Sequence, residues 1–150
     1  MTAQRADRWL LGGAAASALA AALHLGCVMF GATWYRFLGA GEHMARLAEA
    51  GSIRPTLITL VIAMVLLLWS GYALSGAGAT RRWPLLRSAL IVITAIYLLR
   101  GLAGLLLAVT DEAALGRSAT FWAWSSSICL AIGVTHLVGL RSRWPQLAIR

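Results

Sequence analysis

Charged residues are scarce in this sequence. They make up 12% of the 150 residues, against about 25% in soluble domains, whereas apolar residues make up 60%. A soluble fold of this length could not bury so much apolar surface, so we expect lipid to surround most of the chain. The formal charge of +8 does not indicate a nucleic-acid partner, because the basic residues sit between apolar runs and form no basic helix face.

Lysine is absent, so all 13 basic residues are arginine, and only two cysteines occur. Cys27 and Cys129 both lie in apolar runs, where cysteine usually behaves as a small hydrophobic residue, so no disulfide framework is indicated. The sequence also lacks a nucleophile elbow, a His-Glu-x-x-His motif, a phosphate-binding loop and a dinucleotide fingerprint. No cofactor is therefore expected.

Four apolar runs are long enough to cross a bilayer, which needs about 20 residues per helix. They extend over about 10–31, 55–75, 88–109 and 120–140. The first run is longer than the 7–15-residue core of a signal peptide, so we interpret it as an uncleaved helix. The sequence thus predicts an all-α integral membrane protein: a single domain over 1–150, built as a four-transmembrane-helix antiparallel bundle.

A short interfacial helix is expected between the first two spans, over 41–50. Apolar residues fall on one of its faces and charged residues largely on the other: Met44, Leu47 and Ala48 against Glu42, Arg46 and Glu49. Two interpretations remain open. The helix is either a lid over an outward-opening cavity or a connector that keeps its backbone hydrogen-bonded near lipid.

The arginines predict the orientation. The N-terminal segment, the 76–87 loop and the C-terminal segment hold eight arginines and one acid, net +7, whereas the other two loops hold four of each, net zero. Because positively charged loops stay in the cytoplasm, we expect a bacterial-type inner membrane protein with both termini cytoplasmic.

Aromatic residues are expected at both membrane boundaries. On the basic side, tryptophans follow arginines in Arg8-Trp9, Arg82-Trp83-Pro84 and Arg143-Trp144-Pro145, and these arginines could reach lipid phosphates. The opposite belt would consist of Trp34, Tyr35, Phe37, Phe121, Trp122 and Trp124.

Seams of small and polar residues predict which helix faces turn inward, since such residues allow close approach in lipid. The first span carries Gly13, Ser17, Ala20, His24, Cys27 and Gly31, and the fourth carries Trp122, Ser126, Cys129, Gly133, His136 and Leu140. His24 and His136 differ in depth by about 15 Å, too far to bracket one haem iron. A soft-metal site of His24, Cys27 and Cys129 is less favoured than plain packing, so no metal is expected.

Arg100 lies inside the third span, where a charge costs roughly 2.5–3.5 kcal/mol. One interpretation is an outward-facing polar pocket centred on Arg100, with Tyr97, His24 and the Ser125–Ser127 run, Ser126 above all, as walls and Glu42 and His43 above it. Such a pocket would bind a lipid or amphipathic anion. The alternative is a structural arginine satisfied by serines, helix-end carbonyls, or acids such as Asp111 and Glu112.

The expected function is therefore that of a small inner-membrane protein whose partners are membrane lipids, further copies of itself or another membrane protein. Two other functions stay open. One is a membrane enzyme that uses Glu42, His43 and Arg100 on a lipid-like substrate, and the other is an oligomerising channel or transporter protomer.

Overall fold

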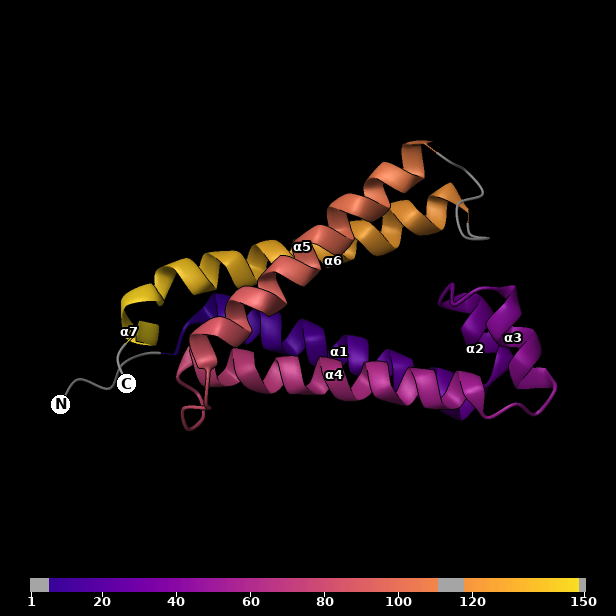
Figure 1. Ribbon diagram of the computed structural model, residues 1–150, viewed down its shortest axis with the longest axis horizontal. Helices are drawn as coiled ribbons and strands as arrows, with labels where there is room; N and C mark the ends of the chain where they lie inside the picture. The colour runs from indigo at the N-terminus through magenta and orange to yellow at the C-terminus, as the bar shows by residue number, and fades with distance from the viewer. Residues whose placement is uncertain (1–5, 111–117, 149–150) are drawn as a thin grey trace.

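The computed structural model describes residues 6–110 and 118–148, and all regular structure in this part of the chain is helical (Figure 1). Four helices are long and apolar enough to cross a membrane: α1 (Arg8–Phe30), α4 (Arg54–Ala77), α5 (Leu86–Thr110) and α6 (Ala119–Ser142). Three are short: α2 (Ala32–Phe37), α3 (Glu42–Glu49) and α7 (Trp144–Ala148). The prediction of an all-α, four-helix, multi-pass membrane protein is confirmed.

The long helices begin and end at local signals in the sequence. Asp7 caps α1 by accepting hydrogen bonds from the backbone N–H groups of Trp9 and Leu10. Pro55 lies in the first turn of α4, and Gly78, with φ of 79°, ends that helix in the left-handed region. The helix bounds agree with the predicted spans to within two residues.

The four long helices form two antiparallel pairs. α1 packs along α4 and α5 packs along α6, whereas the two pairs touch each other less extensively. Figure 1 shows the pairs meeting at the end where α7 lies, which we call the terminal end, and separating toward α2 and α3, which we call the capped end. The bundle is therefore closed at one end and spread at the other.

Leu10 joins the two pairs at the terminal end. Its side chain is fully buried in a cluster with residues of α4, α5, α6 and α7: Ala77, Leu86, Leu90, Leu140 and Leu147. Glycine makes this approach possible, because a Cβ on Gly139 would lie 2.6 Å from Cγ of Leu10. The absence of a side chain there lets α6 and α1 come together.

The predicted seams face the inside of the bundle. On α1, Gly13, Ser17 and Cys27 are buried, while Ala20, His24 and Gly31 are half-buried. On α6, all seam residues are buried except Cys129, which is half-buried. A hydrogen bond of 2.9 Å between the hydroxyls of Ser17 and Tyr97 links α1 to α5.

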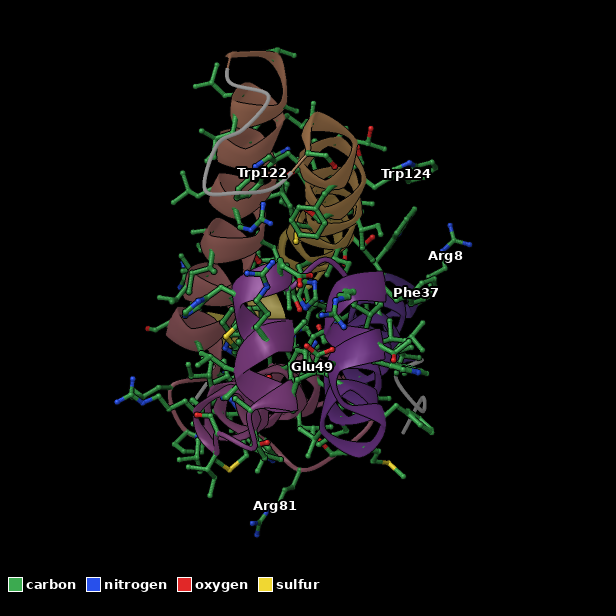
Figure 2. The ribbon with its side chains drawn as sticks, turned by 90° about the vertical axis from the view of Figure 1, so that its right-hand side faces the viewer. Arg8, Phe37, Glu49, Arg81, Trp122 and Trp124 are labelled. Atoms are coloured by element: carbon green, nitrogen blue, oxygen red, sulfur yellow. The ribbon has the colours of Figure 1, made fainter. Side chains whose placement is uncertain are left out.

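The structure corrects the predicted outer aromatic belt. Tyr35 and Trp122 are only 2% and 5% exposed, so they are core residues and cannot face lipid. Phe37 and Trp124 remain exposed, and Figure 2 shows Trp124 pointing away from the bundle. The belt prediction is wrong for Tyr35 because Gly31, with φ of 68°, turns the chain into the separate helix α2, which the sequence pattern did not indicate.

The crossing of α5 and α6 depends on Gly101. A Cβ on Gly101 would lie 2.8 Å from the backbone nitrogen of Leu130, so Gly101→Ala should push the two helices apart and destabilise the protein by about 1–3 kcal/mol. Gly12→Ala is the matched control, because its Cβ would meet only a methyl group of Thr135 at 3.7 Å. Reversible unfolding in detergent should show a lower free energy of unfolding for Gly101→Ala but not for Gly12→Ala. Equal free energies of unfolding for the two variants would contradict the packing argument.

Candidate functional site

A cavity of about 590 Å³ lies where the two helix pairs separate, and its volume is typical of small-molecule sites. Most of the lining is apolar. The lining residues are Ala20, Leu23, His24, Cys27, Tyr35, Leu38, Gly39, Ala40, Met44, Ile58, Thr59, Ile62, Arg100 and Phe121. Arg100 is the one charged side chain among them, so the position of its guanidinium group determines the chemistry of the cavity.

The Arg100 guanidinium is held by neutral groups. Its Nη1 donates a hydrogen bond to Ser126 Oγ at 3.1 Å, and its Nη2 donates to Ser125 Oγ at 3.3 Å. The guanidinium carbon lies 5.0 Å from the ring centroid of Trp122, within cation–π range. Among residues 6–110 and 118–148, no carboxylate lies within 4.0 Å of Arg100. Asp111 and Glu112, the other predicted partners, lie outside the described residues.

Gly104 makes the space that Arg100 uses. A Cβ on Gly104 would collide with Ser126 Oγ and would lie 2.5 Å from Nη1 of Arg100. The arginine side chain therefore folds along its own helix, over the next turn, to reach α6. Arg100 and Gly104 are four residues apart and therefore lie on the same face of α5.

His24 is the second polar residue that lines the cavity. Its Nδ1 donates to the carbonyl oxygen of Ala20 at 2.7 Å, one turn earlier in α1. No described residue forms a hydrogen bond with Nε2, which leaves that atom able to accept a hydrogen bond from a bound molecule. Tyr35 and Thr59, by contrast, satisfy one another through a buried hydroxyl–hydroxyl hydrogen bond of 3.1 Å.

The predicted site residues are only partly brought together. Arg100 and His24 line the same cavity. Ser126 does not line it, but its hydroxyl accepts a hydrogen bond from Arg100. Tyr97 does not line the cavity: it is 5% exposed and packs edge-on against Trp69. Neither Glu42 nor His43 lines it, and both are exposed on α3.

Arginine and glutamate side chains hold α2 and α3 together at the capped end. Arg36 on α2 makes ion pairs with Glu42 at 2.9 Å and Glu49 at 2.6 Å, and Arg46 contacts Glu42 at 3.1 Å. Figure 2, which looks onto this end, shows Glu49 between the α2 and α3 ribbons. These arginines lower the pKa of the Glu42 carboxyl to about 2 and lower the pKa of Glu49 as well. The sequence pattern predicted the helix but missed this network, because Arg36 precedes Gly39 and Gly41 in another element.

A second, more polar cavity of about 550 Å³ adjoins the first near the capped end, and the two share Gly39 and Phe121. Phe121 on α6 packs directly over Gly39, where a Cβ would overlap the phenyl ring. This contact joins the second helix pair to the connection between α2 and α3. Nothing in the sequence identified the Phe121–Gly39 pair, because the two residues are distant in the chain.

The ion pairs between α2 and α3, two helices that we call the cap, predict a pH dependence of stability. Because the folded-state pKa of Glu42 is depressed to about 2 from about 4.5, its contribution to stability is present above pH 4.5 and is lost as pH falls toward 2. The thermal unfolding midpoint should therefore fall over this window. Glu42→Gln should have a lower unfolding midpoint at neutral pH, and its midpoint should fall less on acidification. If the midpoint of this variant fell with pH as steeply as that of the native protein, Glu42 would be excluded as the cause.

The Phe121–Gly39 contact predicts an asymmetry between two glycines. Gly39 (φ 72°) and Gly41 (φ 96°) both have left-handed backbone, so alanine strains both, but only at Gly39 would the new Cβ meet another side chain. Gly39→Ala should therefore destabilise the protein by about 1–3 kcal/mol more than Gly41→Ala. Hydrogen exchange of the α3 amides measures the release of the cap, and equal exchange in both variants would contradict the contact.

Comparisons of this chain with protein-family models, with curated proteins and with solved structures found no match. In the described residues, no group of three or more histidine, cysteine or acidic side chains could hold a metal ion. The candidate site is therefore defined by its own geometry: an apolar cavity between two helix pairs with one guanidinium group in its wall.

Proposed function

We propose that this protein binds an amphipathic anion, a molecule with an apolar chain and a carboxylate or phosphate group, in the cavity beside Arg100. The observation that carries the proposal is the guanidinium group itself. It lines an apolar cavity, and its described polar contacts are two neutral serine hydroxyls. A charge that has no acidic partner among residues 6–110 and 118–148 is costly in such surroundings, and a bound anion would offset that cost.

The hydrogen-bonding capacity of Arg100 supports an anionic ligand. A guanidinium group has five N–H donors, and Ser125 and Ser126 accept only two of them among the described residues. The remaining donors suit the paired oxygens of a carboxylate or phosphate group. His24 Nε2 could receive a hydrogen bond from a protonated ligand oxygen in the same cavity.

The apolar walls support a ligand with a hydrocarbon chain. Leu23 on α1, together with Ile58 and Ile62 on α4, lines the cavity while remaining exposed on the helix surface. Because these side chains would face lipid and also border the cavity, a hydrocarbon chain could pass between them from the bilayer without crossing water. The polar group would then follow toward Arg100.

The charge distribution supports an orientation in which the cavity opens toward the outer half of a bacterial-type inner membrane. At the terminal end, the described arginines outnumber the single acid Asp7: Arg8, Arg81, Arg82, Arg87, Arg141 and Arg143. At the capped end, Arg36, Arg46 and Arg54 face Glu42 and Glu49. By the positive-inside rule the terminal end would be cytoplasmic.

The alternative of a lipid-modifying enzyme has weaker support. Its proposed acid and imidazole, Glu42 and His43, do not line the cavity beside Arg100, and the Glu42 carboxylate already accepts hydrogen bonds from two arginines. No described contact favours a channel or an oligomer. Binding of a lipid-like anion is therefore the function that we put to the test.

The test compares dodecanoate with dodecanol as probes on the protein purified in a non-ionic detergent. Dodecanoate should raise the thermal unfolding midpoint and dodecanol should not, because only the anion can pair with Arg100. Arg100→Gln should weaken dodecanoate binding about tenfold or more. Arg54→Gln removes an exposed arginine that does not line the cavity and should bind normally.

Three results would overturn the proposal. Equal stabilisation by the acid and the alcohol would show that charge is irrelevant to binding. Retention of dodecanoate binding by a folded Arg100→Gln protein would exclude this site. Misassembly of that variant without any effect of dodecanoate on the native protein would assign Arg100 a purely structural role.

A further inference from the structure

The arginines of the two Arg-Trp-Pro segments are engaged within the protein, which leaves other arginines to face lipid at the terminal end. Arg82 donates from Nη1 to the carbonyl of Gln146 at 2.9 Å and from Nη2 to that of Leu147 at 2.5 Å. Arg143 donates to the carbonyl of Ala77 at 3.3 Å. These bonds satisfy backbone carbonyl groups at the C-terminal ends of α4 and α7. The expectation that both arginine side chains reach lipid phosphates is therefore corrected.

Arg87 and Arg141 are placed differently. The guanidinium carbon of Arg87 lies 3.6 Å from the ring centroid of Trp144, so it rests on one face of the indole. Arg141 and Trp144 both line a cavity of about 590 Å³ on the outside of α5 and α6, whose other walls are Ile91, Leu137 and Leu140. The groove thus has apolar walls together with the Trp144 indole and Arg141, and Arg87 rests on the same indole without itself lining the groove.

No acid among the described residues compensates these two charges. All the ion pairs within 6–110 and 118–148 lie at the capped end. Asp7, the described acid of the terminal end, accepts hydrogen bonds from the first turn of α1 and from the Ser142 hydroxyl. Arg87 and Arg141 therefore keep most of their N–H donors available, and Trp144, on which Arg87 rests, lines a groove with apolar walls.

We propose that Arg87, Arg141 and Trp144 form a binding site for an acidic phospholipid of the leaflet at the terminal end. The phosphate group would lie between the two guanidinium groups, and one acyl chain would follow the groove along Ile91 and Leu137. Basic pockets beside apolar helix faces recognise anionic head groups in this way, and tryptophan favours the same interfacial depth. The site is separate from the cavity beside Arg100 and does not depend on its ligand.

The test measures retention of dioleoyl phosphatidylglycerol and dioleoyl phosphatidylcholine by native mass spectrometry. Each comparison is made with Arg100 intact and again with Arg100→Gln, so that any lipid held by the other cavity is identified. We expect the acidic lipid to be retained in preference to the zwitterionic one, and the double variant Arg87→Gln with Arg141→Gln to weaken its binding about tenfold. The matched control, Arg8→Gln with Arg81→Gln, removes the same charge from side chains that point away from the bundle in Figure 2 and should bind normally.

A second variant keeps the charge and blocks the groove. Leu137→Trp places a large ring where the acyl chain would lie, so it should also weaken lipid retention, even if the double arginine variant fails to fold. If both double variants lost the same amount of phosphatidylglycerol binding, net charge alone would explain the loss and the proposed site would be overturned. Equal retention of the two lipids would also overturn it, as would full displacement of phosphatidylglycerol by millimolar inorganic phosphate, which would indicate a site for free phosphate.

Discussion

The convergence of four helices on Leu10 is the contact on which the rest of the structure depends. Leu10 is fully buried among leucine side chains of α5, α6 and α7, and glycine at position 139 allows α6 to approach it. In lipid, packing of this kind replaces the hydrophobic effect as the force that associates helices. The two helix pairs are held together at that end and diverge toward the other, and the cavity lies in the space between them there.

In the cavity wall, neutral side chains stabilise the positive charge of Arg100. Arg100 reaches α6 because Gly104 leaves room, and there two hydroxyls and the Trp122 ring share the cation. Such contacts reduce the cost of burial without neutralising the charge. The cap has the opposite character, because its arginines and glutamates pair with one another and leave little net field.

The sequence determined more of the fold than of the site. Span lengths, the Asp7 cap and the seams of α1 and α6 follow from local periodicity and capping, which a single sequence displays directly. The interpretation of Arg100 as the centre of a polar pocket placed His24 in its wall, and the two residues do line one cavity. Tyr97 faces the inside of the bundle as predicted, but it does not reach the cavity, because its hydroxyl is hydrogen-bonded to Ser17.

What the sequence could not display were contacts between distant segments. The turn at Gly31 buries Tyr35 against Thr59, and Phe121 packs on Gly39 from another helix pair. Neither contact leaves a periodic signal, because each joins two different elements that are distant in the chain. The placement of Glu42 and His43 away from Arg100 has the same origin: the cap is organised by Arg36, a residue of a helix that the pattern did not reveal.

The divergence of the two helix pairs also has a consequence for their fit to a bilayer. The spanning helices have 23 to 25 residues, so each is about 35 Å long, several ångströms more than a typical hydrocarbon core. Two pairs that diverge cannot both stand along the membrane normal, so at least one must tilt, and the excess length accommodates that tilt. The angle between the pairs is thereby coupled to bilayer thickness through hydrophobic matching.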